Sequence, residues 1–159
     1  MRPLYVVQSL APDRSDQAYP VVRLQQPALA LDQWRSLCRA ALASGDHAGR
    51  EPGDPDAILI CIDSLGYIRG PCMYRIAYDS GRRPVLSVPT FIASSTLDPA
   101  GVAMALLRSL AAISRELHCT GLRVGVSEED APTGRFLAAH GFVALPGEPF
   151  WSAEAGAPP

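Results

Sequence analysis

Three apolar, strand-like runs follow one another in the middle of the chain, separated only by short turns. These runs are Ala57–Ser64, Gly70–Asp79 and Arg83–Ala93, and the segment LGYIRG between the first two extends one or both of them. Neighbouring runs joined by turns this short predict antiparallel hairpins. Pro89, inside the third run, predicts a bulge or a sheet edge, because proline cannot donate a ladder hydrogen bond.

Helical and strand patterns flank this segment on both sides. In chain order they are a strand at Leu4–Leu10, helices at Gln17–Gln26 and Leu31–Ala43 separated by Pro27, a polar loop at Ser44–Asp56, a long helix at Pro99–Leu117, a strand at Gly121–Glu129, a helix at Asp130–Gly141 and a final strand or hairpin over residues 142–153. The order β-α-α-β-β-β-α-β-α-β predicts an α/β protein with a mixed, largely antiparallel sheet flanked by helices.

Length and composition place the chain among soluble globular proteins. It has 159 residues, 48% hydrophobic and 19% charged, which is enough for one domain with a core and unlike a disordered chain. We expect a single domain over residues 1–152 and a flexible tail over residues 153–159.

Charge and hydropathy limit the kinds of partner and the location that we expect for the protein. The net charge of −2 gives no general electrostatic case for nucleic acid, and all 14 basic residues are Arg. No stretch approaches about 20 consecutive apolar residues, and no signal-peptide pattern opens the chain, so a cytoplasmic protein without a membrane span is the default inference. The four cysteines form no CxxC pair and have no histidine at ligand spacing, so no metal is expected.

The junction SSTLDPAG, between the third run and the long helix, is a candidate anion site. The first turn of a helix has unpaired N–H groups and a positive dipole end, and small residues there let a phosphate approach. Ala100, Gly101 and Ala103 are small, but Asp98 is a typical N-cap and places a negative charge at this position. The Walker A and GxGxxG patterns are absent.

This junction and the segment Leu122–Phe142 together resemble the GNAT superfamily, the GCN5-related N-acetyltransferases. The R/Q-x-x-G-x-G/A loop of that family falls on residues 98–103, its V-S-x-x-N-like segment on Val126–Asp130, and its (F/L)-Y-x-x-x-G-F ending on FLAAHGF at Phe136–Phe142. The order of elements over nearly the whole chain also matches.

The resemblance implies the acyl-CoA N-acyltransferase fold and acetyl transfer from acetyl-CoA to an amine, without a metal. It implies that the thioester lies in a V-shaped gap between the strand before the long helix and the strand after it. The residues that it assigns to acetyl-CoA are Thr90, Phe91, Ile92, Asp98, Pro99, Ala100, Gly101, Val102, Ala103 and Asp130.

Three positions depart from the family pattern. Asp98 stands where the family has Arg or Gln, Asp130 where it has Asn, and Leu137 where it often has the Tyr that protonates the leaving thiolate. An alternative is therefore a catalytically impaired protein of this fold that acts as a binding or regulatory module.

The remaining candidates for proton transfer are few. Ser127 and Glu128 end the strand after the long helix, and Tyr74 and Tyr78 share one face of the second run. The acceptor, a small-molecule or peptide amine, has no diagnostic pattern. A homodimer whose last strand pairs with a partner is compatible with either function, and the sequence leaves the oligomeric state open.

Overall fold

The structure is a computed structural model that describes residues 4–42 and 55–154. Almost all of the predicted loop Ser44–Asp56, and most of the predicted tail, lie outside these residues. The elements are β1 (Tyr5–Ser9), the short 3-10 helix η1 (Pro12–Arg14), α1 (Ser15–Gln25), α2 (Leu31–Leu42), β2 (Ala57–Asp63), β3 (Ile68–Tyr78), β4 (Pro84–Phe91), α3 (Pro99–Glu116), β5 (Gly121–Gly125), α4 (Ala131–Ala139), β6 (Val143–Ala144) and β7 (Phe150–Glu154).

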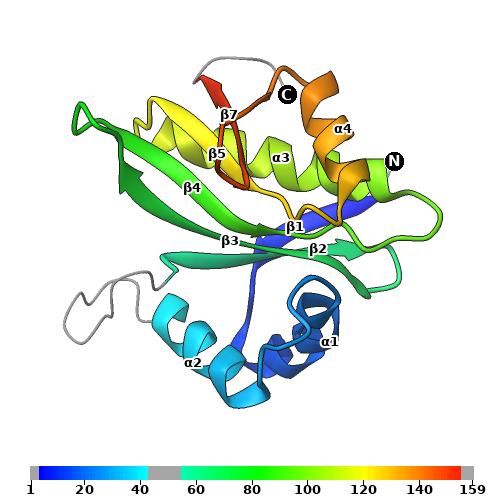
Figure 1. Cartoon of the computed structure of the whole chain (residues 1–159). Helices are drawn as coiled ribbons and strands as arrows, with labels where there is room; N and C mark the ends of the chain where they lie inside the picture. The colour runs from blue at the N-terminus through cyan, green and yellow to red at the C-terminus, as the bar shows by residue number, and fades with distance from the viewer. Residues whose placement is uncertain (1–3, 43–54, 155–159) are drawn as a thin grey trace.

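The strands form one seven-stranded sheet in the order β1-β2-β3-β4-β5-β7-β6 (Figure 1). Strands β2, β3 and β4 pair antiparallel with their sequence neighbours, which confirms the predicted hairpins. Among the described strands, β4 and β5 are the one parallel pair, and α3 makes the crossover between them. The predicted α/β class and mixed, largely antiparallel sheet are confirmed.

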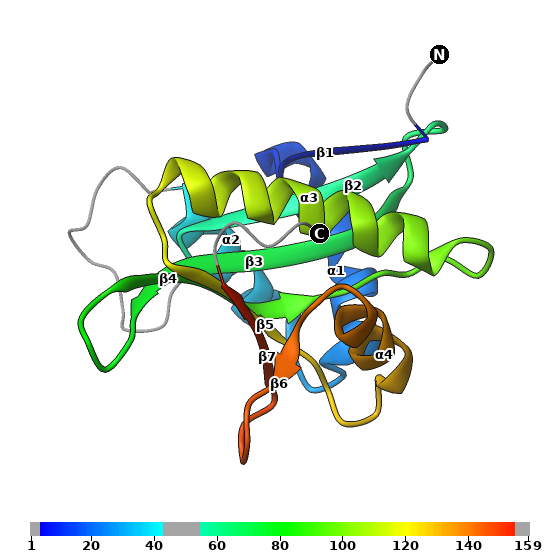
Figure 2. The same ribbon diagram turned by 90° about the horizontal axis from the view of Figure 1, so that it is seen from above.

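Helices cover both faces of the sheet, α3 and α4 on one side and α1 and α2 on the other (Figures 1 and 2). The larger core lies under α3, where Leu106, Leu107 and Leu110 are almost fully buried with Val88 and Val124. A second core on the opposite face surrounds Trp34 of α2. Within the described ranges, no helix is both long and apolar enough to cross a bilayer.

Both hairpin turns in the middle of the sheet are closed by an aspartate. Asp63 accepts hydrogen bonds from the N–H groups of Leu65 (2.9 Å) and Tyr67 (3.0 Å) and pairs with Arg69 at 2.7 Å. Asp79 repeats the arrangement with the N–H groups of Gly81 and Arg83, each at 2.9 Å, and with the Arg83 guanidinium at 3.1 Å. Such Asp-to-backbone bonds favour tight turns, so these residues help to set the strand register.

The predicted irregularity at Pro89 is a bulge in β4. Arg75 pairs with Ser87 and Met73 pairs with Thr90, so three steps along β4 (87 to 90) match two along β3 (75 to 73). The extra residue lies next to Pro89, which has no N–H to lose from the ladder. A bulge bends its strand, and this one falls where β4 approaches β5.

The strand after α3 is shorter than the sequence pattern predicts. We expected Gly121–Glu129, but β5 ends at Gly125. The following residues form a turn in which the N–H of Asp130 donates to the Ser127 carbonyl at 2.9 Å and the N–H of Glu129 donates to Ser127 Oγ at 3.3 Å. Asp130 is the N-cap of the next helix, because its side chain accepts from the N–H of Thr133.

Candidate functional site

The parallel strands β4 and β5 pair over a short distance and then part. Leu86, Ser87 and Val88 pair with Leu122, Arg123 and Val124, respectively. Beyond this point β4 continues to Phe91 and turns toward α3, whereas the N–H of Val126 donates to the carbonyl of Pro149, beside β7, at 2.8 Å. The ends of the two strands therefore follow different neighbours and leave a gap between them.

Glycine is required at the point of parting. A Cβ added to Gly125 would lie 2.8 Å from the carbonyl oxygen and 3.2 Å from the carbonyl carbon of Pro89. Backbone atoms at that distance cannot move aside as a flexible side chain can. Gly125 thus lets β5 reach the bulge of β4 immediately before the strands separate.

A cavity of about 370 Å³ occupies the gap. One wall is the continuation of β4 at Ile92, Ala93 and Ser94, and the opposite wall is the turn after β5 at Ser127, Glu129, Asp130 and Pro132. The end of α1 contributes Leu24 and Gln25. Two of the residues predicted to bind acetyl-CoA, Ile92 and Asp130, therefore line one cavity although they come from different parts of the chain.

Two further cavities adjoin the same turn. One of about 210 Å³ is lined by Gln25, Gln26, Pro89, Gly125, Val126, Ser127, Pro149 and Phe150. The other, of about 810 Å³, lies between α4 and the β6–β7 turn and includes Glu128, Arg135, Glu148 and Trp151. Ser127 lines all three cavities, so its side chain lies where they meet.

Two glutamines hold the end of α1 against β4. The side-chain amide of Gln26 donates to Thr90 Oγ1 at 3.0 Å, and that of Gln25 donates to the carbonyl oxygen of Phe91 at 3.4 Å. The Thr90 and Phe91 side chains are themselves almost fully buried. Sequence reasoning did not single out these glutamines, because a Gln at the end of a helix carries no recognisable signal.

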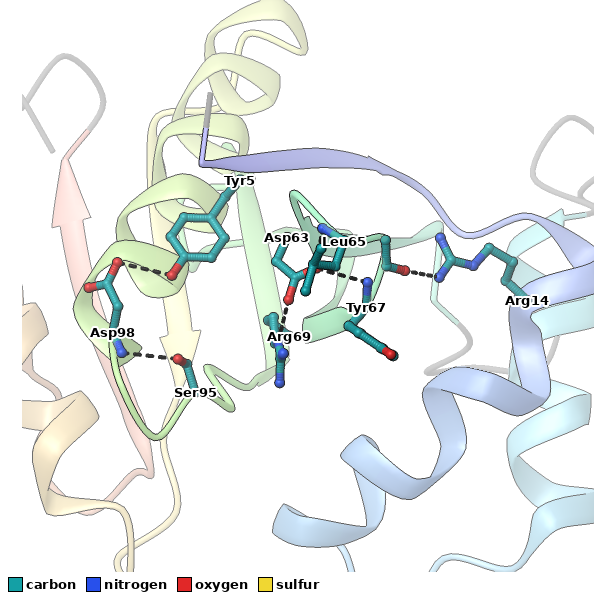
Figure 3. Close-up of polar contacts among 9 residues, drawn as sticks. Tyr5, Arg14, Asp63, Leu65, Tyr67, Arg69, Ser95 and Asp98 are labelled. Carbon is teal, nitrogen blue, oxygen red and sulfur yellow. Dashed lines mark hydrogen bonds and ion pairs between the residues drawn. The ribbon is translucent and has the colours of Figure 1, made fainter. Parts of the chain in front are cut away.

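The N-terminus of α3 is capped by Asp98, as predicted. Asp98 Oδ1 accepts a hydrogen bond from the N–H of Gly101 at 2.9 Å. Asp98 Oδ2 accepts one from the hydroxyl of Tyr5 at 3.0 Å (Figure 3). The N–H of Asp98 in turn donates to Ser95 Oγ at 3.0 Å. A Cβ at Gly101 would lie 2.7 Å from Asp98 Cγ, so the room beside this glycine is filled by the carboxylate.

Tyr5 is suited to remain a hydrogen-bond donor in this contact. Burial, followed by the hydrogen bond to Asp98 and the charge of that carboxylate, raises the pKa of Tyr5 above its ordinary value. The phenol therefore keeps its proton throughout the neutral range. The sequence offered no signal for this contact, because 93 positions separate the two residues.

The other predicted residues are placed as follows. Pro99 and Ala100 are exposed in the first turn of α3, and Val102 and Ala103 face the core. Tyr78 is 69% exposed at the end of β3, and Tyr74 is half-buried against the larger core. Neither tyrosine lines any of the three cavities.

Burial first, and then the charge of Asp56, raises the pKa of Tyr74, to which Glu116 at the C-terminal end of α3 also contributes. That end is opposite the Asp98 cap, so Tyr74 lies away from the gap. Leu137, which stands at the family's Tyr position, is fully buried in the larger core. Of the candidates for proton transfer, the structure brings Ser127 and Glu128 to the cavities.

The chain has a mixed sheet in which the one parallel pair of the described strands separates beside a cavity, and a long helix begins after the first strand of that pair. This arrangement defines the acyl-CoA N-acyltransferase class of folds. Solved structures of GNAT acetyltransferases share this architecture with the chain. An acetyltransferase of the GNAT family from Staphylococcus aureus matches with a TM-score of 0.70 at 12% identity, over 95% of this chain and 99% of that one.

Two further solved structures extend this likeness. An aminoglycoside N-acetyltransferase in complex with CoA matches with a TM-score of 0.70 at 16% identity, over 89% of each chain. An acetyltransferase from Trypanosoma brucei matches with a TM-score of 0.62 at 18% identity, over 89% of this chain and 94% of that one. No family model and no curated protein matches the sequence. The chain thus has the GNAT acetyltransferase fold, which confirms the resemblance drawn from its sequence.

Proposed function

We propose that the protein is an N-acetyltransferase that moves an acetyl group from acetyl-CoA to the amine of a small-molecule or peptide acceptor. The observation that carries this proposal is the cavity between the parted ends of β4 and β5, lined by both strands' continuations. A structure with the same fold, the aminoglycoside N-acetyltransferase, was solved with CoA bound.

The cavity suits the uncharged arm of the donor. Ile92, Ala93 and Pro132 give it apolar surface, and Ser94 and Ser127 add hydroxyl groups. Glu129 and Asp130 add acidic groups at the turn after β5. The pantetheine arm of CoA is a chain of methylene and amide groups, so it requires apolar contact with a few hydrogen bonds. These residues fit that part of the donor, and they would hold the thioester close to Ser127.

Transfer forms a C–N bond and breaks a C–S bond, so a proton must leave the amine and one must reach the thiolate. Ser127 would relay the second proton, donating its own hydrogen to the thiolate while it takes one from water, so that the hydroxyl is restored. Its Oγ accepts the N–H of Glu129, and a hydroxyl that accepts one hydrogen bond still has its own hydrogen to donate. Glu128, the adjacent exposed carboxylate, would take the amine proton directly or through one water.

The acceptor would enter from the side of α4 and the β6–β7 turn. The cavity of about 810 Å³ there carries the carboxylates of Glu128 and Glu148 and the indole of Trp151. Neither carboxylate forms an ion pair with another residue of the described ranges. A cationic amine would gain from both charges, and Ser127 connects this cavity with the donor gap.

Ligand-dependent stabilisation tests the proposal. Acetyl-CoA at 100 times its dissociation constant should stabilise the fold by about 2.7 kcal/mol, visible as a raised Tm. Ala93→Trp, which fills the donor cavity, should remove the shift, whereas Ala139→Trp, on the exposed side of α4 and away from the three cavities, should keep it. No shift at millimolar acetyl-CoA would contradict the proposal.

Release of free CoA with a panel of amines then separates an enzyme from a binding module. A thermal shift with acetyl-CoA, together with CoA release that depends on one of the amines, supports acetyl transfer. A shift without release for any amine supports a module that binds the donor without turnover.

A further inference from the structure

The positive end of α3 already holds an anion that belongs to the chain itself. Pro99 has no N–H, the N–H of Gly101 donates to Asp98 Oδ1 at 2.9 Å, and the N–H of Val102 approaches the Asp98 carbonyl at 3.4 Å. An aspartate carboxylate at this position interacts favourably with the positive end of the helix dipole, as a bound phosphate would. An external phosphate arriving here would find a negative charge and the N–H of Gly101 already in use.

The carboxylate is also fixed in place from outside the helix. Tyr5, on the edge strand β1, donates its hydroxyl hydrogen to Asp98 Oδ2 at 3.0 Å (Figure 3). With the Gly101 N–H on Oδ1, each carboxylate oxygen has a partner. The missing side chain of Gly101 provides the space that the carboxylate fills. Asp98 is thus seated by three elements, the loop before α3, the first turn of α3, and β1.

An arginine close to this region is engaged with another carboxylate. Arg69, on β3, forms an ion pair with Asp63 at 2.7 Å (Figure 3). No ion pair joins Asp98 to a cation among the described residues. The charge at the opening of α3 is therefore negative, which disfavours the diphosphate of an incoming CoA.

Building on the proposed function, we propose that Asp98 makes this protein select its acyl donor by the pantetheine arm and not by the diphosphate. The arm lies in the gap between β4 and β5, which Asp98 does not occupy. Acyl donors that consist of a pantetheine thioester without the nucleotide are then bound about as tightly as acetyl-CoA. Asp98 is the residue that sets this specificity, and Tyr5 is a positioning residue that acts through it.

Calorimetric dissociation constants for acetyl-CoA and for acetyl-pantetheine test the inference without requiring turnover. For the wild-type protein we expect the two constants to agree within about fivefold. Asp98→Ser keeps a hydroxyl that can cap the helix but removes the charge. We expect Asp98→Ser to bind acetyl-CoA at least about tenfold more tightly, because a repulsive charge is removed. The dissociation constant for acetyl-pantetheine should not change. Asp32→Ser, in the first turn of α2 on the opposite face, removes an equal charge and should change neither constant.

Asp98→Asn provides a second variant that keeps the shape of the side chain. Its amide oxygen can still accept the Gly101 N–H while the charge is gone, so it should tighten acetyl-CoA binding as Asp98→Ser does. If Asp98→Ser does not fold, this variant decides, and an unchanged acetyl-CoA constant would overturn the inference.

The outcomes separate the inference from the proposed function. Wild-type protein that binds acetyl-CoA far more tightly than acetyl-pantetheine, with no gain in Asp98→Ser, overturns the role of Asp98 and leaves acetyl transfer standing. Absence of binding of both thioesters, by the wild type and by the variants, overturns both proposals.

Discussion

The carbonyl oxygen of Pro89 faces the Cα of Gly125 so closely that a methyl group on Gly125 would lie 2.8 Å from it. This is the last close approach between β4 and β5 before the two strands part. Pro89 has no N–H to pair and Gly125 has no side chain to interfere. The close approach of β4 and β5 therefore depends on a residue without an N–H and a residue without a side chain.

Gly125→Ala should both destabilise the fold and distort the gap between β4 and β5. The new methyl group meets backbone atoms of Pro89, which move only if the strands move. Forcing an extra methyl group into a packed position costs about 1–3 kcal/mol. We expect a loss of this size in the free energy of unfolding, measured by urea denaturation, and weaker acetyl-CoA binding.

Gly81→Ala is the matched control for this prediction. A Cβ there would lie 3.4 Å from the Asp79 carboxylate, which is an ordinary contact, and the residue is exposed. It should unfold at the same urea concentration as the wild type. Equal stability of Gly125→Ala and Gly81→Ala would show that β5 is free to move away from Pro89.

Ser127→Ala should lower the rate of acetyl transfer without weakening the fold. If the Ser127 hydroxyl protonates the leaving thiolate, its loss should reduce kcat by about 100-fold, the lower range for a positioned acid. Ser94→Ala removes another hydroxyl from the same cavity and should leave kcat near the wild-type value. A wild-type rate for Ser127→Ala would show that solvent, and not Ser127, protonates the leaving thiolate.

Low pH should lower the stability of the fold, because protonation of Asp63 weakens the hydrogen bonds and the ion pair that close the β2–β3 turn. Burial raises the pKa of Asp63, but hydrogen bonds from Arg69, Tyr67 and Leu65 outweigh it, and the pKa lies below its ordinary value. A carboxyl group with a lowered folded-state pKa contributes stability that is present above its unfolded pKa of about 4 and is lost as the pH falls through the folded value.

The measurement is urea denaturation of the wild type and of Asp63→Asn between pH 7 and pH 2. The variant should be less stable at pH 7, and the difference should shrink as the pH falls below about 4. Asp13→Asn, in the exposed helix η1, serves as the control, with an expected curve like that of the wild type. A constant difference across the whole pH range would contradict the role of the Asp63 charge.

The cysteine thiols should be inert in the native state. All four cysteines are free and buried. Burial, with a smaller effect of the Asp63 charge, raises the pKa of Cys61 to about 11, and burial likewise raises the pKa of Cys72. At pH 8 only about one Cys61 thiol in a thousand would be the reactive thiolate.

Titration with a chromogenic disulfide reagent at pH 8 checks this expectation. The native protein should react slowly, and four thiols should appear on unfolding in guanidinium chloride. Rapid reaction of a whole equivalent in the native state would mean that one of these side chains becomes exposed by local opening.

The parts of the fold that the sequence predicts well are those fixed by neighbouring residues. Asp98 and Asp130 cap helices through bonds to the third residue along, so each is visible in a short window. The hairpins around β3 follow from apolar runs with short turns, and Pro89 marks its own bulge because of its missing N–H.

The sequence is less informative where the contacting residues are far apart in the chain. It is also less informative where apolar residues continue beyond the end of a strand. β5 is followed by Val126, which is buried, so the pattern suggests a longer strand than the structure contains. Tyr5 bonds to Asp98 although 93 positions separate them, and Gln26, the residue after α1, bonds to Thr90 of β4. Such pairings depend on the assembled fold, and no local pattern encodes them.

The sheet separates the core under α3 from the core around Trp34. Substitutions in α1 and α2 can therefore be accommodated without repacking the residues behind the donor gap. The end of α1 approaches the gap through side chains such as Gln25 and Gln26. The two halves of the molecule can therefore diverge at different rates. Residues around Trp34 could then change many times while the packing under α3 stays the same.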